Sequence, residues 1–163
     1  MRKHKFVIGE YYHIYNRGTD KRQIIMDSKD AARFVQGLVA FNSLDPIGSI
    51  YESSFDIKRK KGKTLTEIIC YCLNPNHFHL LLRQKEENGI SKFVNRFSSG
   101  FAKYFNHRHK RAGTLFQGPF KAKHVTDNDY LLHLSAYINL NDKVHQLGTQ
   151  GSKLVRSSWN EYI

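Results

Sequence analysis

A turn followed by a β-strand is encoded by Asn74-Pro-Asn-His-Phe-His-Leu-Leu-Leu82, near the middle of this 163-residue chain. Successive side chains of a strand point to opposite faces, so His77 and His79 share one face while the apolar residues between and after them enter the core behind. Imidazole nitrogens bind many divalent ions, and two that converge on one point supply half of a metal site. The stretch therefore predicts a strand that is both a core element and a candidate metal site.

A third ligand with an oxygen donor is needed, because two ligands do not hold a hard divalent ion. The candidate is Asn141, which lies four residues after Tyr137 and shares one helix face with it. An asparagine near the end of a helix is also an ordinary cap, so both interpretations of Asn141 stay open. A tyrosine has a pKa of about 10 and needs a polarised target to act as a nucleophile. A divalent cation beside a phosphodiester provides this, so Tyr137 is the candidate nucleophile for phosphoryl transfer.

The segments around this strand show alternating strand and helix signals. The expected elements are strands at about 10–16, 66–73, 77–83 and 120–125, and helices at about 28–42, 90–105 and 130–143. Their order predicts an α+β fold, a ferredoxin-like split βαβ antiparallel sheet with an additional C-terminal helix that carries the tyrosine. We expect the helices to cover one sheet face and to leave the histidine face available. A stripe of Leu131, Leu134 and Ile138 is expected to fasten the last helix to the sheet.

The composition indicates a single cytoplasmic domain, residues 1–163, with a polyanionic partner. Lysine and arginine number 26 against 14 acidic residues, a formal net charge of +12, and nucleic acid is the first candidate partner. No apolar stretch of membrane-spanning length occurs near the N-terminus, so no membrane association is expected.

Two segments carry most of the candidate DNA contacts. Residues 58–63 hold five positive charges in six positions, and residues 88–126 contain no acidic residue at all. The first segment could also be a solvated loop, whereas the second predicts a phosphate-binding groove. The candidate DNA-binding residues are Arg17, Lys58, Arg59, Lys60, Lys92, Arg96, Lys103, Arg108, Lys121 and Lys123.

The only two cysteines, Cys70 and Cys72, have a spacing that suits neither a disulfide framework nor a Cys-x-x-Cys site. On the expected strand they are small buried hydrophobic residues of one face. The alternative is a structural zinc site shared with His77 and His79, which needs both thiolates on the histidine face.

The combined motifs resemble a known family. Asn74-Pro-Asn-His-Phe-His-Leu-Leu-Leu82 with Tyr137-Ile-Asn-Leu-Asn141 is similar to the HUH single-tyrosine transposases (IS200-like), and within them to the REP-associated tyrosine transposases of bacteria. The resemblance extends along nearly the whole chain, through Tyr12-His-Ile-Tyr-Asn-Arg-Gly18, Gly113-Thr-Leu-Phe-Gln117 and Ser157-Ser-Trp159. His-x-His alone would be a weak signal, but the combination is specific.

The resemblance implies a function and a set of residue roles. His77, His79 and Asn141 would bind Mg²⁺ or Mn²⁺, and Tyr137 would cut single-stranded or hairpin DNA, forming a 5′-phosphotyrosine and freeing a 3′-OH. The protein would act as a monomer or a homodimer, since related enzymes differ in this respect. One departure is Asp142, where the family usually has proline, so the end of the tyrosine helix could differ in shape and an extra carboxylate could stand near the metal.

A different function class is a module that binds structured DNA or RNA without chemistry. Ferredoxin-like RNA-recognition domains use aromatic residues exposed on the sheet strands for stacking on bases. Tyr11, Tyr15 and Tyr71 could serve this purpose.

Overall fold

The computed structural model describes residues 5–45, 62–140 and 155–158. In chain order the elements are β1 (Tyr11–Arg17), the 3-10 helix η1 (Thr19–Lys21), α1 (Ser28–Ala40), β2 (Thr66–Leu73), β3 (His77–Gln84), α3 (Gly89–Arg108), β4 (Lys121–Val125), α4 (Asn128–Asn139) and β5 (Arg156–Ser157). Among these described residues, no helix is long and apolar enough to cross a membrane.

The strands form one antiparallel sheet in the order β4-β1-β3-β2-β5. β3 lies between β1 and β2, which is the split arrangement expected from the order of strands and helices along the chain. The hairpin of β2 and β3 closes tightly, since the backbone N–H of Asn74 donates to the carbonyl of His77 at 2.9 Å. The predicted α+β fold class is confirmed, and the short β5 extends the sheet beyond β2.

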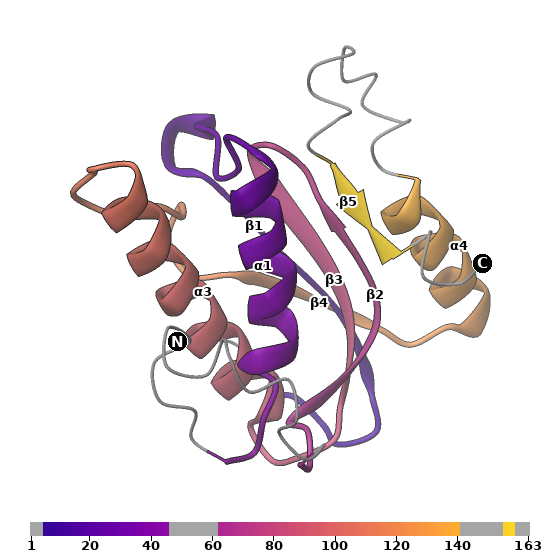
Figure 1. Ribbon diagram of the computed structural model, residues 1–163. Coiled ribbons are helices and arrows are strands. Elements are labelled where there is room, and N and C mark those ends of the chain that lie inside the picture. The colour runs from indigo at the N-terminus through magenta and orange to yellow at the C-terminus, as the bar shows by residue number, and fades with distance from the viewer. Residues whose placement is uncertain (1–4, 46–61, 141–154, 159–163) are drawn as a thin grey trace.

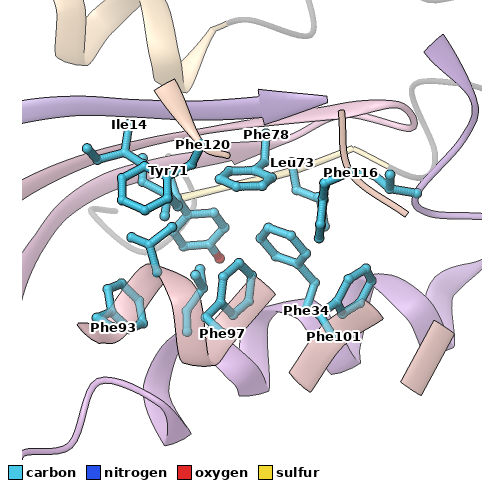
Figure 2. Close-up of a cluster of buried hydrophobic side chains, with 14 of the residues drawn as sticks. Ile14, Phe34, Tyr71, Leu73, Phe78, Phe93, Phe97, Phe101, Phe116 and Phe120 are labelled. Atoms are coloured by element: carbon cyan, nitrogen blue, oxygen red, sulfur yellow. The ribbon is translucent and has the colours of Figure 1, made fainter. Parts of the chain in front are cut away.

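An aromatic core lies between the sheet and the helices α1 and α3. Figure 2 shows Phe78 of β3 facing Phe34 of α1 and Phe97 and Phe101 of α3. The Phe34 and Phe97 rings meet edge to face at 4.6 Å, and the Phe34 and Phe78 rings lie 5.4 Å apart. Such aromatic pairs add to the stabilisation from buried area. This layer holds β3 in place from behind and turns the alternate residues of β3 to the other face.

The second face of the sheet is partly covered by α4 (Figure 1). A smaller core forms there, in which Leu134 and Ile138 of α4 pack with Cys70, Cys72 and Leu81. The predicted stripe is confirmed, because Leu131 packs against the same cluster and both Leu134 and Ile138 are buried. The expectation that all helices would lie on one side was wrong in this respect, since α4 buries its apolar stripe against the histidine face.

Side-chain caps explain where α1 and α4 begin. The Asp27 carboxylate accepts from the backbone N–H groups of Lys29 and Asp30, and the Asp127 carboxylate accepts from those of Asp129 and Tyr130. Each carboxylate satisfies N–H groups that the first helical turn leaves without a partner. The start of α4 is therefore set by a local motif seven residues or more before Tyr137.

Candidate functional site

The face of β3 that carries His77 and His79 continues across the neighbouring strands. Residues directly opposite in an antiparallel pair lie on the same face. One row across β4, β1, β3 and β2 is Lys121, Tyr15, His79 and Cys72, and the next row is Lys123, His13, Leu81 and Cys70. The sheet thus places imidazoles at its centre with basic side chains on the β4 side.

His77 is held between two asparagines of the hairpin turn. Its Nδ1 lies 2.6 Å from Oδ1 of Asn76, and its Nε2 lies 3.1 Å from Nδ2 of Asn74. Because an amide oxygen only accepts and an amide nitrogen only donates, these contacts correspond to a neutral ring protonated on Nδ1. The lone pair of His77 is then on Nε2, where a cation would replace the contact with the Asn74 amide.

His79 contacts a third histidine, His13 of β1. Nδ1 of His79 lies 2.8 Å from Nε2 of His13, and the two rings are stacked with centroids 5.1 Å apart. Burial, with a smaller contribution from the positive charge of Lys123, lowers the pKa of His13 to about 4. His13 is therefore neutral at neutral pH.

The rings of His77 and His79 lie edge to face on the same face of the sheet, with centroids 5.1 Å apart. A hollow of about 360 Å³ opens beside them, and both histidines line it. Its other lining residues are Tyr15, Asn16, Arg17, Lys21, Asn76, Phe78, Gln117 and Lys121. The hollow thus combines imidazoles with three cationic side chains, which suits a phosphate group.

α4 brings Tyr137 to the same place. The Tyr137 ring meets the His79 ring edge to face at 6.3 Å, and 40% of the Tyr137 side chain stays exposed. Tyr130, two turns earlier, is bound instead to Lys123, whose ammonium donates to the phenol oxygen at 3.1 Å and lies over the ring. Only Tyr137 of these two tyrosines has a ring contact with the candidate metal site.

The end of α4 is anchored to β2 through Ser158. The Ser158 hydroxyl donates to Oδ1 of Asn139 at 2.7 Å and accepts from the backbone N–H of Tyr71 at 3.1 Å. Asn139 and Ser158 are both buried. This connection fixes the helix two residues after Tyr137 and limits how far the phenol can move from His79.

The donor set fits part of a divalent metal site. Among the described residues, no three histidine, cysteine, aspartate or glutamate side chains gather to hold an ion. Two neighbouring imidazoles, with space for oxygen ligands in the hollow beside them, nevertheless suit a hard or borderline divalent cation. The predicted third ligand, Asn141, lies outside the described residues.

The zinc alternative is wrong. Cys70 and Cys72 do share the histidine face, but all four residues of that proposal are described and they do not form a metal cluster. Both thiols are buried in the core under α4, and burial raises the pKa of Cys70 to about 12. Both thiols serve as small packing groups, which is the first interpretation of these cysteines.

The structure divides the predicted DNA-binding residues between two sides of the sheet. Arg17, Lys121 and Lys123 are exposed around the histidine face, where the Arg17 guanidinium also bonds to Gln117. Lys92, Arg96, Lys103 and Arg108 belong to α3, which packs on the opposite face. Residues 88–126 therefore do not line one groove. Lys58, Arg59 and Lys60 lie outside the described residues.

Two of the α3 arginines have intramolecular partners. Arg96 donates to the carbonyl of Ser43 at 3.1 Å. Arg108 forms ion pairs with Asp27 and with the fully buried Asp30. These contacts give both arginines a structural role, and contact with DNA stays a prediction for them.

The aromatic residues expected from a stacking module are not all exposed on the sheet. Tyr71 is buried in the core beneath α1 and α3, whereas Tyr11 and Tyr15 are half-buried on the histidine face. α4 also packs over part of that face, which a base-stacking surface of this kind needs to keep open.

The site includes four residues that no sequence pattern had indicated as functional, namely His13, Lys21, Asn76 and Gln117. His13 alternates with Tyr15 along β1, so the period of two could have indicated a shared face, but not which residues of β3 lie opposite. The register of β1 on β3 supplied that information.

Comparisons with known proteins identify a family and a similar fold. The family described as transposase IS200 like matches residues 7–141, which is most of the chain. A structure of a REP-associated tyrosine transposase bound to a REP hairpin aligns with a TM-score of 0.63 at 15% identity, covering 99% of this chain and 83% of that one. A structure from Deinococcus radiodurans R1 that is assigned as a transposase aligns with a TM-score of 0.48 at 16% identity, covering 85% and 95%. None of the curated proteins compared matches.

The first structural likeness supports the fold, and the family match supports the identity. That match spans β1, β3, β4 and the whole of α4. The chain belongs to the family of IS200-like transposases, enzymes of DNA transposition.

Proposed function

We propose that this transposase nicks single-stranded DNA beside hairpin-type repeats and transfers the strand through a tyrosine intermediate, with a divalent metal ion. The observation that carries the proposal is the edge-to-face contact of Tyr137 with His79 at 6.3 Å, since it joins a solvent-accessible phenol to the paired imidazoles. These groups come from elements that are far apart in sequence, α4 and β3. Packing that serves only stability has no need of a half-exposed phenol at this position.

The reaction is a transesterification at phosphorus. The Tyr137 oxygen attacks the phosphodiester, a new bond forms between that oxygen and phosphorus, and the bond from phosphorus to the 3′ oxygen breaks. The phenol proton leaves and the departing 3′ oxygen gains one, so the products are a 5′-phosphotyrosine and a free 3′-OH. Attack of a different 3′-OH on the phosphotyrosine reverses the chemistry and rejoins DNA. The tyrosine ester conserves the bond energy between the two steps, so no cofactor is consumed.

His77 and His79 would hold Mg²⁺ or Mn²⁺, with Asn141 as the third ligand. When bound, the ion acts as a Lewis acid on the scissile phosphate. The chain itself orients the phenol, because the buried stripe of α4 and the Ser158 contact to Asn139 limit its position. Holding a nucleophile near its target is worth several kcal/mol of barrier.

The DNA is proposed to lie across the exposed edge formed by β4 and the end of β1. Arg17, Lys121 and Lys123 surround the histidines there and can neutralise backbone phosphates. The structural relative bound to a REP hairpin supports hairpin DNA as the partner.

Covalent capture tests this proposal. A pool of stem-loop oligonucleotides with randomised single-stranded flanks is incubated with the protein and Mn²⁺, and the products are separated on a denaturing gel. A label at the 3′ end of the DNA should move to the size of the protein. A label at the 5′ end should appear in a shortened strand that a polymerase can extend from its new 3′-OH.

Two tyrosine variants form a matched pair. Tyr137→Phe removes one oxygen and should abolish both products while DNA binding persists. Tyr130→Phe also removes one oxygen from the same helix and should keep both products. An adduct formed by the Tyr137 variant but not by the Tyr130 variant would refute the nucleophile assignment. DNA binding without any adduct from the wild-type protein, across the whole pool, would favour a non-catalytic binding module.

A further inference from the structure

His79 and His77 share a feature beyond the face on which they lie. Each has its Nδ1 within hydrogen-bonding distance of a neighbouring side chain, Asn76 for His77 and His13 for His79. The Asn76 oxygen can only accept, so it selects the His77 tautomer with the proton on Nδ1. The partner of His79 is another imidazole, which can either donate or accept.

The direction of the bond between His13 and His79 decides whether His79 can bind a cation. If His13 donates from Nε2, the neutral His79 ring carries its proton on Nε2 and has no lone pair for a cation there. If His79 donates from Nδ1, its Nε2 keeps a lone pair. Ring nitrogens that ligate a metal almost always have the other ring N–H bound to such a second partner.

We infer that His13 is a positioning residue that accepts a hydrogen bond from Nδ1 of His79 and so keeps the His79 Nε2 lone pair available to a cation. The inference rests on the proposed function, in which His79 is a ligand. It matches the tautomer that the asparagine contacts select in His77, so both rings would present Nε2.

Burial and ring contacts hold the His13 side chain in one position. Only 9% of the residue is exposed, its ring stacks on His79 and contacts the Tyr15 ring at a tilt, and its backbone lies within β1. Lys123, the residue opposite His13 on β4, carries an ammonium group that donates hydrogen bonds and accepts none.

Two variants separate the acceptor from the ring. His13→Phe keeps an aromatic ring for stacking and removes the acceptor, whereas His13→Gln keeps an acceptor oxygen and removes the ring. Tyr15→Phe is the control, because the Tyr15 ring also stacks on His79, at 5.9 Å, and loses only its hydroxyl. Thermal melting of each variant verifies that it is folded.

The first measurement is the tautomer of His79 in the metal-free wild-type protein. Long-range ¹H–¹⁵N spectra distinguish the two neutral forms, and the His79 signals are assigned by their loss in His79→Asn. We expect the proton on Nδ1. A proton on Nε2 would overturn the inference, and this result needs no His13 variant to fold and no metal to bind.

The second measurement is Mn²⁺ affinity, from the electron paramagnetic resonance signal of the free ion. His13→Phe should bind Mn²⁺ about 10- to 100-fold more weakly than the wild-type protein, as loss of an outer partner of a ligand typically does. His13→Gln and Tyr15→Phe should stay near the wild-type affinity. Equal affinities of the wild type and His13→Phe would overturn the role of His13 and leave the proposed function standing. Absence of Mn²⁺ binding by the wild type would overturn the metal part of the proposed function, and the role of His13 with it.

Discussion

Asp30 is the charged residue whose removal should destabilise the fold most. Its side chain is fully buried at the start of α1, where α3 ends beside it. The carboxylate accepts from the backbone N–H of Met26 at 2.9 Å, from Tyr104 at 3.3 Å and from Arg108, and it lies 2.9 Å from Nε2 of His109. Asp30→Ala leaves these groups without their acceptor inside the core.

The expected loss of stability depends on which hydrogen-bond partners of Asp30 can bond to another acceptor. Arg108 still has Asp27, to which it also donates, so its loss is partly compensated. The backbone N–H of Met26 and the ring of His109 depend on the buried carboxylate, and hydrogen bonds to a charged group are worth about 1.5–3 kcal/mol each. We expect Asp30→Ala to lower the free energy of unfolding by about 4 kcal/mol, which for a domain of this size lowers Tm by roughly 8–16 °C.

Urea unfolding followed by circular dichroism measures this change. Asp20→Asn is the control, because the Asp20 side chain is 84% exposed, its ion pair with Arg22 is 3.8 Å long, and asparagine tolerates the left-handed backbone at this position (φ 55°), so the change should alter stability very little. A value for Asp30→Ala within about 1 kcal/mol of the wild type would refute the buried network as a source of stability. The network also predicts that Arg108→Met destabilises the protein without changing the salt dependence of DNA binding, whereas a DNA contact of Arg108 predicts the opposite pattern.

Three further changes test other parts of the molecule. In fluorescence titrations, changing both Lys121 and Lys123 to glutamine should reduce the slope of log affinity for single-stranded DNA against log salt concentration by about 1.4. The same change at Lys92 and Lys103, on the other side of the sheet, should leave this slope nearly unchanged. Ser158→Ala should lower the free energy of unfolding by about 1–3 kcal/mol, because it removes the buried hydrogen-bond partner of Asn139 and of the Tyr71 N–H. It should also speed hydrogen exchange at the end of α4, and unchanged exchange would show that Ser158 does not hold the helix. Hydrogen bonds from Arg108 hold the pKa of Asp27 well below its usual range, so the stabilisation by the Asp27–Arg108 pair is complete above about pH 4 and is lost as the pH falls further. Asp27→Asn should therefore flatten the acid branch of the curve of unfolding free energy against pH. A curve identical to that of the wild type would argue against a stabilising Asp27–Arg108 pair.

The sequence alone determined the elements and the chemistry they could carry. β2 spans Thr66–Leu73 as expected, because β-branched and aromatic residues between turn residues specify a strand locally. The caps of α1 and α4 are also local, since Asp27 and Asp127 satisfy N–H groups within three residues of themselves. The alternation of His77 and His79 with apolar residues likewise indicated a shared face without any knowledge of their neighbours.

Tertiary structure decided which side chains meet. The register of β1 on β3 sets Tyr15 opposite His79 and brings His13 to its Nδ1, and a shift by one residue would have turned both to the core. Lys103 lies on α3, which packs on the sheet face opposite to the one that carries Lys121 of β4, although both lysines belong to one run without acidic residues. The spacing of apolar residues along the chain shows which side chains share one face of their own helix or strand. It does not record which face of the sheet that element covers, because this depends on contacts between residues far apart in sequence.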